Sequence, residues 1–227
     1  MKLIACDQGG PEWWAARIGR PTASGFHLIL TPKKAEPSKS QGGYVHRLCA
    51  EWLLGHPLDE DVTDLMARGT DMESEAARYY EFHRDATLER AGFCESDDGQ
   101  TGCSADYLVG ADGIVEIKCP GAAHHVAYML GEAQDDHRPQ VQGQLWITGR
   151  QWVDLVAYHP DLPTVITRYE RDDLYIKKLA DELPRFCAKL NEAKERLIAA
   201  GHHPPDDAVA GWLKAWLERN NAMAGVT

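Results

Sequence analysis

The order of apolar and polar positions divides the chain into helices and short strands. The pattern predicts helices over residues 11–19, 21–30, 44–54, 71–83, 122–130 and 138–147, the second opened by Thr22 or Ser24 as N-cap. Runs of β-branched and aromatic residues between turn signals predict strands over 87–94, 102–109, 114–119, 152–158 and 164–170. We therefore expect an α/β fold of the mixed α+β kind, with helices flanking a central mixed β-sheet.

The C-terminal part predicts one long helix and one separate helix. Residues 172–200 form a continuous helical pattern in which Pro184 predicts a kink. After the linker "GHHPPDD", a helix from about 208 to 220 carries an apolar face made of Val209, Trp212, Leu213, Trp216 and Leu217. This face either docks on the core of its own subunit or reinforces a subunit contact or partner site. We expect residues 1–203 to form a single domain and 204–227 a linker with this amphipathic helix.

Composition and charge exclude several classes of protein. The 227 residues are 44% hydrophobic without an apolar run of about 18 residues, and no signal peptide is evident, which predicts a cytoplasmic protein without a membrane span. The net charge of −11 argues against a broad basic surface. Residues 1–50 nevertheless hold seven lysines or arginines against three acids, whereas residues 51–100 hold four against fourteen. This asymmetry suggests one locally positive region on an acidic body.

Cysteines and histidines do not predict a zinc site. The six cysteines lack a C-x-x-C spacing, and we expect them to be reduced and mostly buried. The pairs His124–His125 and His202–His203 have no spacing that specifies zinc, so we expect them on the surface or in the linker.

The segment "GCSADYLVGADGIVEIKCP" (residues 102–120) carries the candidate chemistry. It predicts two strands joined by a turn at Asp112-Gly113. Glu116 and Lys118 then project from one face of the second strand, and Asp106 of the paired strand can lie next to them. Converging carboxylates require a cation, and Mg²⁺ is suited to one or two carboxylates together with water and phosphate. A nearby lysine can orient a water nucleophile or stabilise charge in the transition state.

Two alternatives apply to this segment. A bare Glu-x-Lys is short and common, and more often it is an ion pair on the wet face of a strand. Asp112 is a rival to Asp106 as the first acid, but its Asp-Gly pair is typical of a hairpin turn.

The chain resembles a known family at several places in the same order. "SAD" followed by "EIKCP" resembles the PD-(D/E)XK nucleases, specifically the phage lambda-type alkaline exonucleases, or YqaJ-like viral recombinases. "WWAARIGRPTAS", "GTDMESEA", "PQVQGQLWITG" and "YERDDLYI" resemble further segments of that family. The resemblance covers roughly residues 13–198. It implies a restriction-endonuclease-like core and makes residues 1–203 a nuclease domain.

The resemblance also implies roles for individual residues. Asp106 and Glu116 would hold Mg²⁺, two ions in each site with Mn²⁺ as an alternative, and the Ile117 carbonyl would complete part of the shell. Lys118 would position or activate the attacking water. Glu73 would be an additional acid of the site, although Thr70 to Glu73 also match a capping box, in which Glu73 would only bond to a helix start.

A second group of residues resembles the family's pocket for a terminal 5′-phosphate. It consists of Arg17, Ser24, Ser104 and Gln140. Arginine offers a fork of donors to phosphate, and a serine at a helix start adds further donors. Without the resemblance, Ser24 would be a capping residue and Arg17 a solvated one. For Gln142 and Gln144 we expect a supporting hydrogen-bond role.

The implied activity is that of a Mg²⁺-dependent 5′-to-3′ exodeoxyribonuclease. It would degrade one strand of linear double-stranded DNA from a 5′-phosphorylated end to mononucleotides and leave 3′ single-stranded tails for recombination by strand annealing. The family further implies a ring-shaped homotrimer, a single-strand annealing protein as partner, and a phage or prophage protein in a bacterial host. The alternatives are an endonuclease of the same fold, of the restriction or junction-resolving kind, and a non-catalytic DNA-binding module.

Overall fold

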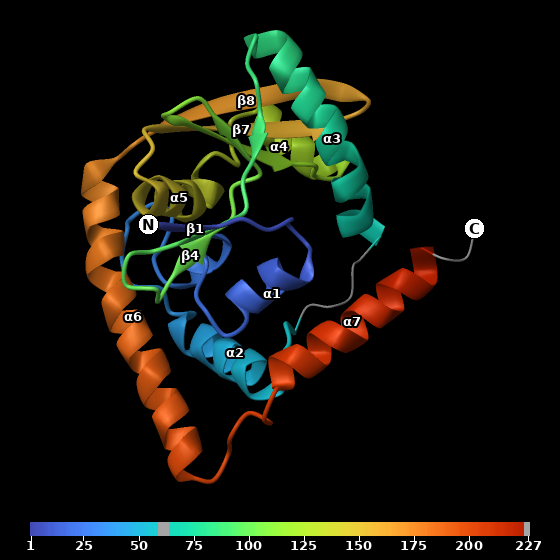
Figure 1. Ribbon diagram of the computed structural model, residues 1–227. Coiled ribbons are helices and arrows are strands. Elements are labelled where there is room, and N and C mark those ends of the chain that lie inside the picture. Colours follow the sequence, from blue (N-terminus) through green and yellow to red (C-terminus); the bar gives the residue numbers. More distant parts are fainter. Residues whose placement is uncertain (59–63, 225–227) are drawn as a thin grey trace.

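The chain folds around two β-sheets with helices on both sides (Figure 1). The structure is a computed structural model that describes residues 1–58 and 64–224, with side chains for 1–58 and 72–218. The three-stranded sheet has the order β1-β3-β4, with strands β1 (Lys2–Ile4), β3 (Phe93–Glu95) and β4 (Gly102–Cys103). The five-stranded sheet has the order β2-β5-β6-β7-β8, with strands β2 (Glu89–Arg90), β5 (Tyr107–Val109), β6 (Gly113–Lys118), β7 (Trp152–His159) and β8 (Leu162–Glu170).

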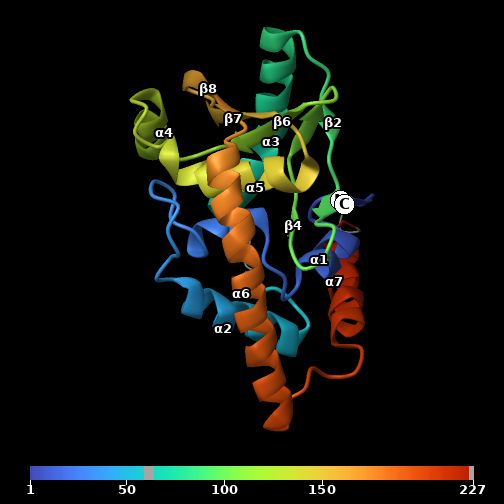
Figure 2. The same cartoon turned by 90° about the vertical axis from the view of Figure 1, so that its left-hand side faces the viewer.

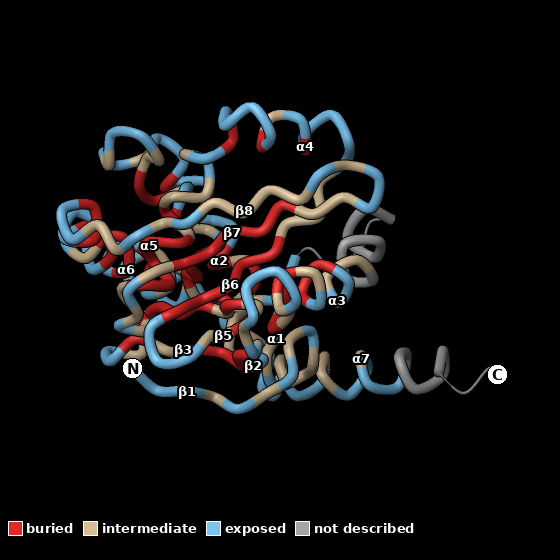
Figure 3. Tube along the Cα trace, turned by 90° about the horizontal axis from the view of Figure 1, so that it is seen from above, coloured by how far each residue is buried: buried red, intermediate tan, exposed pale blue. Residues whose placement is uncertain are grey.

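The five-stranded sheet is mixed, as the sequence predicted. β6 and β7 pair in parallel, and every other pair in this sheet is antiparallel. The parallel pair places two buried strands in the middle of the molecule, where Figure 3 shows them in red. Helix α5 (Arg138–Thr148) packs on the face of the sheet that carries Ile114 and Leu155. Helix α3 (Asp64–Arg84) packs on the opposite face, against Val115 and Ile117.

The remaining elements are helices. They are α1 (Pro11–Arg17), the 3₁₀ helix η1 (Ala23–Leu28), α2 (Gln41–Leu54), α4 (Ala122–Met129), the 3₁₀ helix η2 (Asp135–His137), α6 (Asp173–Ala199) and α7 (Ala208–Ala224). Of these, α4 packs on β7 and β8 of the five-stranded sheet. Phe26 of η1, Leu48 of α2 and Phe186 of α6 share one apolar cluster. Figure 2 shows α6 running along the molecule beside α2 and α5. Asp172 caps α6 by accepting bonds from the N–H groups of Leu174 and Tyr175.

Two strands predicted as continuous are each broken in two. Residues 87–94 form β2 and β3, and residues 102–109 form β4 and β5, so each predicted strand contributes to both sheets. At the second break, side chains replace the interstrand hydrogen bonds. Gln8 Nε2 donates to the Ala105 carbonyl at 2.5 Å, and Gln144 Nε2 donates to the Ser104 carbonyl at 3.3 Å. Because these carbonyls are satisfied from outside the sheet, the chain can leave one sheet and enter the other.

Other predicted boundaries shift. The predicted helix over 21–30 is the shorter η1, and neither Thr22 nor Ser24 caps it through its side chain. The hairpin turn lies at Gly110 to Asp112, since Gly113 already belongs to β6, and Gly110 supplies the left-handed φ of 51°. His125 is fully buried and bonded to the Pro163 carbonyl, so its predicted surface position was wrong. Four cysteines are buried and all six are free, as predicted.

The buried carboxylate of Asp154 joins α3 to the sheet. Asp154 of β7 is fully buried and accepts two hydrogen bonds from Arg168 of β8, at 2.7 and 2.8 Å. The Tyr80 hydroxyl of α3 donates to the same carboxylate at 2.7 Å. Since every carboxylate oxygen is paired, the charge is compensated in its buried position, and α3 is fixed to the sheet at Tyr80.

Among the described residues, no helix has both the length and the apolar character needed to span a membrane.

Candidate active site

Asp106 lies in the break between β4 and β5 and faces β6. Tyr107 pairs with Val115, so the preceding residue, Asp106, lies opposite Glu116 and on the same face of the sheet. The Asp106 carboxylate accepts a hydrogen bond from the Ile117 N–H at 2.6 Å. The strand break therefore brings the two acids together, as the sequence predicted, although the strand itself is not continuous.

Glu116 is buried and held by three donors. Its side chain is only 4% exposed. Oε1 accepts from Lys118 Nζ at 2.8 Å and from Gln140 Nε2 at 2.6 Å, and Oε2 accepts from Gln144 Nε2 at 2.6 Å. This burial argues against the alternative of an exposed Glu–Lys pair on the wet face of a strand. Both glutamines come from α5, so this helix fixes the orientation of the carboxylate.

The charges of this cluster influence one another strongly. Burial raises the pKa of the Asp106 carboxyl well above its ordinary range, and the nearby Glu116 raises it further. Burial lowers the pKa of Lys118, but the carboxylates of Glu116 and Asp106 outweigh this effect, so its pKa is higher than usual. Lys118 is therefore a charged hydrogen-bond donor at neutral pH.

Glu73 approaches the cluster from α3. This helix begins at Asp64, so Thr70 is inside it and the capping-box alternative is wrong. Glu73 makes an ion pair with Arg90 at 3.7 Å. Burial raises the pKa of Glu73; Arg90 lowers it and Glu116 raises it, which places Glu73 within electrostatic range of the site.

The donor set fits a divalent cation of the Mg²⁺ kind. Asp106 and Glu116 are two adjacent carboxylates; burial and the nearby Glu116 raise the pKa of Asp106, and a bound cation would favour its charged form. The buried Oε1 of Gln144 has no partner among the described residues, and such atoms are usually satisfied by water or an ion. The described residues contain no cluster of three or more His, Cys, Asp or Glu able to form a complete cage. Two carboxylates with water are the coordination that Mg²⁺ accepts. For Ile117 the contact seen is through its N–H.

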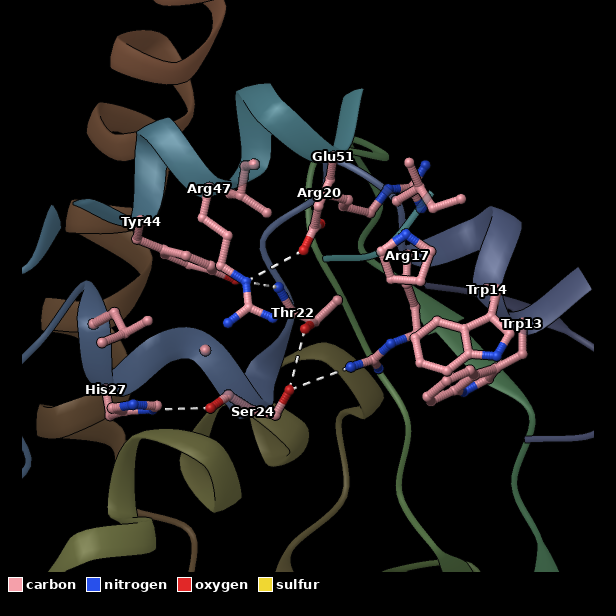
Figure 4. Close-up of a pocket in the computed structure, with 15 residues that line it drawn as sticks. Trp13, Trp14, Arg17, Arg20, Thr22, Ser24, His27, Tyr44, Arg47 and Glu51 are labelled. Carbon is pink, nitrogen blue, oxygen red and sulfur yellow. Dashed lines mark hydrogen bonds and ion pairs between the residues drawn. The ribbon is translucent and has the colours of Figure 1, made fainter. Parts of the chain in front are cut away.

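A second site lies beside the first and is basic. It is a cavity of about 550 Å³ whose lining includes Arg17, Arg20 and Arg47. Figure 4 shows the Arg17 guanidinium between the two tryptophans of α1 and Ser24. All three arginines belong to the first 50 residues, so three of the seven basic residues of that segment line one cavity.

Arg17 differs from its two neighbours in its partners. Arg20 pairs with Glu95 at 2.6 Å and Arg47 with Glu51 at 3.2 Å. Among the ion pairs of residues 1–58 and 72–218, none involves Arg17. Its Nη1 donates to Ser104 Oγ at 3.3 Å and its Nη2 to Ser24 Oγ at 3.4 Å.

Burial lowers the pKa of Arg17, and the nearby acids Glu51 and Glu116, which act in the opposite direction, do not offset it. A half-buried guanidinium with hydroxyl partners is suited to an anion such as phosphate.

The structure thus separates the predicted phosphate-binding group. Arg17, Ser24 and Ser104 lie together, whereas Gln140 lies with the carboxylates. Gln144 supports Glu116, as expected. The supporting bonds of Gln142 go elsewhere, to the Glu170 carbonyl and the Asp172 N–H.

Several side chains near the site were missed by sequence reasoning. Trp13 donates through Nε1 to Ser104 Oγ at 2.6 Å. His137 bonds to the Tyr128 hydroxyl at 2.5 Å, and its pKa is lowered to about 4, first by burial and then by Lys118. The paired tryptophans were the available signal for Trp13. No local signal marked His137, because it approaches Lys118 only through the fold.

The fold and the site define a class of protein: a mixed sheet that carries Asp106, Glu116 and Lys118 is the core of the PD-(D/E)XK nucleases. The model of the YqaJ-like viral recombinase domain matches residues 12–151. The chain belongs to the YqaJ-like viral recombinase family. A comparison with curated proteins finds no match.

Solved structures agree with this assignment. The alkaline exonuclease LHK-Exo from Laribacter hongkongensis is 33% identical, with a TM-score of 0.75 over 84% of this chain and 97% of that one. LHK-Exo in complex with dAMP gives the same values. A phage-related exonuclease from Haemophilus somnus 129PT is 16% identical, with a TM-score of 0.66 over 78% of this chain and 96% of that one, and shares the fold.

Proposed function

We propose that this protein is a Mg²⁺-dependent exonuclease that degrades one strand of linear double-stranded DNA in the 5′-to-3′ direction. It begins at a 5′-phosphorylated end, releases mononucleotides and leaves 3′ single-stranded tails for recombination. One observation carries the proposal. A carboxylate cluster suited to a cation and an arginine suited to an anion are connected by only three residues, Ser104 to Asp106. Family membership and the likeness to LHK-Exo support the exonuclease class.

In this proposal the carboxylate cluster performs the hydrolysis. Asp106 and Glu116 hold Mg²⁺, which when bound stabilises charge on the oxygens of the reacting phosphate. Gln140 and Gln144 keep Glu116 in a fixed orientation through their bonds to its two oxygens. Lys118, a charged donor, orients the attacking water and stabilises negative charge that develops on the phosphate.

The basic cavity recognises the end of the strand. Arg17 donates to the terminal phosphate, and the hydroxyls of Ser24 and Ser104, which now accept from Arg17, can turn to donate as well. Ser104 is two residues from Asp106, so a phosphate bound by Arg17 has a fixed relation to the carboxylates. Such positioning converts end binding into selection of the next phosphodiester bond.

The decisive experiment compares three DNA substrates. Linear duplexes with 5′-phosphate and with 5′-hydroxyl ends and a closed circle are incubated with the protein, in Mg²⁺ and in EDTA. We expect rapid loss of the 5′-phosphorylated strand in Mg²⁺, slow loss of the 5′-hydroxyl strand, an intact circle, and no reaction in EDTA. Cutting of the circle would favour an endonuclease of the same fold, and binding without cleavage a non-catalytic module.

Assembly and partner belong to the same proposal. The family resemblance suggests a ring-shaped homotrimer around DNA and a single-strand annealing protein as partner, in a phage or prophage setting. A ring would let the acidic surface face solvent while the basic cavities face the DNA. Sedimentation tests the trimer, and pull-down with a single-strand annealing protein tests the partnership.

A further inference from the structure

A continuous line of aromatic contacts connects α7 to the basic cavity. Trp212 of α7 meets Trp14 edge-on, with ring centroids 6.3 Å apart and an interplanar angle of 85°. Trp14 meets Trp13 in the same manner at 4.7 Å and 76°. The Arg17 guanidinium lies 4.2 Å from the centroid of the Trp13 ring, on its face. These geometries are the favourable ones for aromatic pairs and for a cation on a ring.

Helix α1, which carries three of these four side chains, has little support of its own. It is seven residues long, none of them fully buried, and its N-cap, Gly10, provides no side-chain bond. A helix this short is not stable by itself, so its position is set by tertiary contacts. Figures 1 and 2 show α7 beside α1, and the two helices are in contact.

The start of α7 is in turn fixed by the end of α2. Gly55 has a left-handed φ of 72°, and a Cβ on it would lie 2.4 Å from the Cβ of Ala208. Only glycine permits this approach, so the first residue of α7 is seated against the turn that ends α2. Pro57, just after this turn, lines the same cavity as Arg17.

We infer that Trp212 is a positioning residue for end recognition: through Trp14 and Trp13 it holds Arg17 in place to receive the terminal phosphate. The inference rests on the proposed function. Trp13 fixes the arginine in two ways, since its ring lies under the guanidinium and its Nε1 holds Ser104, which also binds Arg17. Helix α7 lies outside residues 12–151, so end selection in this chain depends on a segment beyond the family domain.

The test is the preference for a 5′-phosphate, the ratio of kcat/KM on 5′-phosphorylated and 5′-hydroxyl duplexes. Trp212→Ala in the full-length protein should lower this ratio severalfold, through a higher KM for the phosphorylated substrate. Trp212→Phe, which keeps a ring against Trp14, should restore most of it. Leu217→Ala is the matched control, because this leucine is on the same helix but 42% exposed. It should leave the ratio unchanged.

Stability is measured beside the ratio. If Trp212 matters only for folding, Trp212→Ala has a lower melting temperature, but its folded molecules keep the wild-type preference for a 5′-phosphate. That result would overturn the inference. If Trp212→Ala does not fold, Trp212→Leu is used in its place with the same expectation. Arg17→Ala distinguishes the proposed function from the positioning role of Trp212. If this variant loses the preference for a 5′-phosphate and the Trp212 variants keep it, only the role of Trp212 is refuted. A wild-type protein without preference removes both.

Discussion

The carboxylate cluster on β6 and the basic cavity beside α1 are neighbouring sites whose charged groups have opposite sign. In the first, Asp106 and Glu116 share one ammonium group, that of Lys118, and the pKa of Asp106 is raised. In the second, Arg17 has hydroxyl partners and its pKa is lowered. Burial is the first cause of both shifts, since it disfavours the charged form of each group, and Glu116 raises the pKa of Asp106 further.

This contrast indicates what the protein binds. A buried ion pair such as Asp154 with Arg168 is complete within the fold and needs no ligand. The carboxylate cluster and the basic cavity differ from such a pair. The first is suited to binding a cation and the second to binding an anion. In the proposed function, DNA would supply the anion and Mg²⁺ the cation, and one reaction would use both sites.

The largest expected effect comes from removing a carboxylate. Asp106→Ala or Glu116→Gln should reduce Mg²⁺-dependent cleavage by about a thousandfold or more, because the metal contributes several kcal/mol to the stabilisation of charge in the transition state. DNA binding, measured by fluorescence anisotropy, should change little. Asp112→Ala is the control, since Asp112 is exposed in the turn. Substantial cleavage by Asp106→Ala together with loss in Asp112→Ala would show that Asp112 is the first acid.

Next in size is the effect of the arginine. Arg17→Ala should lower the preference for 5′-phosphorylated ends by about ten- to a hundredfold, because a charge-assisted hydrogen bond contributes about 1.5–3 kcal/mol. Initial rates on both duplexes give the ratio. Lys118→Ala should slow both substrates alike, since it acts on the scissile phosphate. If Arg17→Ala keeps the wild-type ratio, Arg17 has a structural role and does not recognise the terminal phosphate.

A smaller effect is expected for Glu73. Its ion pair with Arg90 and its electrostatic interaction with Glu116 suit an outer ligand that holds metal-bound water. Glu73→Gln should therefore raise the Mg²⁺ concentration needed for half-maximal cleavage by about tenfold, as for other groups that support a metal site. Glu75→Gln, on the exposed side of α3, is the matched control. Equal Mg²⁺ dependence in wild type and Glu73→Gln would exclude Glu73 from the site.

The smallest effect concerns stability in EDTA. The folded-state pKa of Asp106 is raised above its ordinary value of 3.8, so its contribution to stability is present at low pH and is lost as pH rises through the folded pKa. Asp106→Asn keeps an acceptor for Ile117 without the charge. Its Tm should exceed that of the wild type by a few degrees at pH 8, given about 2–4 °C per kcal/mol for a chain of this size. The difference should vanish near pH 4.

Addition of Mg²⁺ should reverse this order. The wild type should gain Tm and Asp106→Asn should not, because binding to the folded state stabilises it. The Mg²⁺ affinity of the wild type should also rise with pH, since a ligand carboxyl must lose its proton. A Tm advantage of Asp106→Asn that is independent of both pH and Mg²⁺ would contradict the pKa shift.

The sequence alone was sufficient to predict the central sheet and to place the two acids of the cluster next to each other. Strands β6, β7 and β8 have strong β-branched runs, and alternation alone put Glu116 and Lys118 on one face. The break at Ser104 to Asp106 was not predictable, because the groups that replace the ladder, Gln8 and Gln144, are distant in sequence. The same holds for Gln140, whose position on α5 faces Glu116 only once the helix is docked.

Tyr80 and Glu73 lie on the same side of α3, seven residues or about 10.5 Å apart along the helix axis. The bond from Tyr80 to Asp154 fixes one point of this helix, and the buried Ala76 and Ala77 pack on the sheet between that point and Glu73. A tilt of α3 by about 10° around that point would move Glu73 by roughly 2 Å, more than the tolerance of a metal ligand. In the proposed site, the angle at which α3 packs on the sheet would therefore set how far Glu73 reaches toward Asp106 and Glu116.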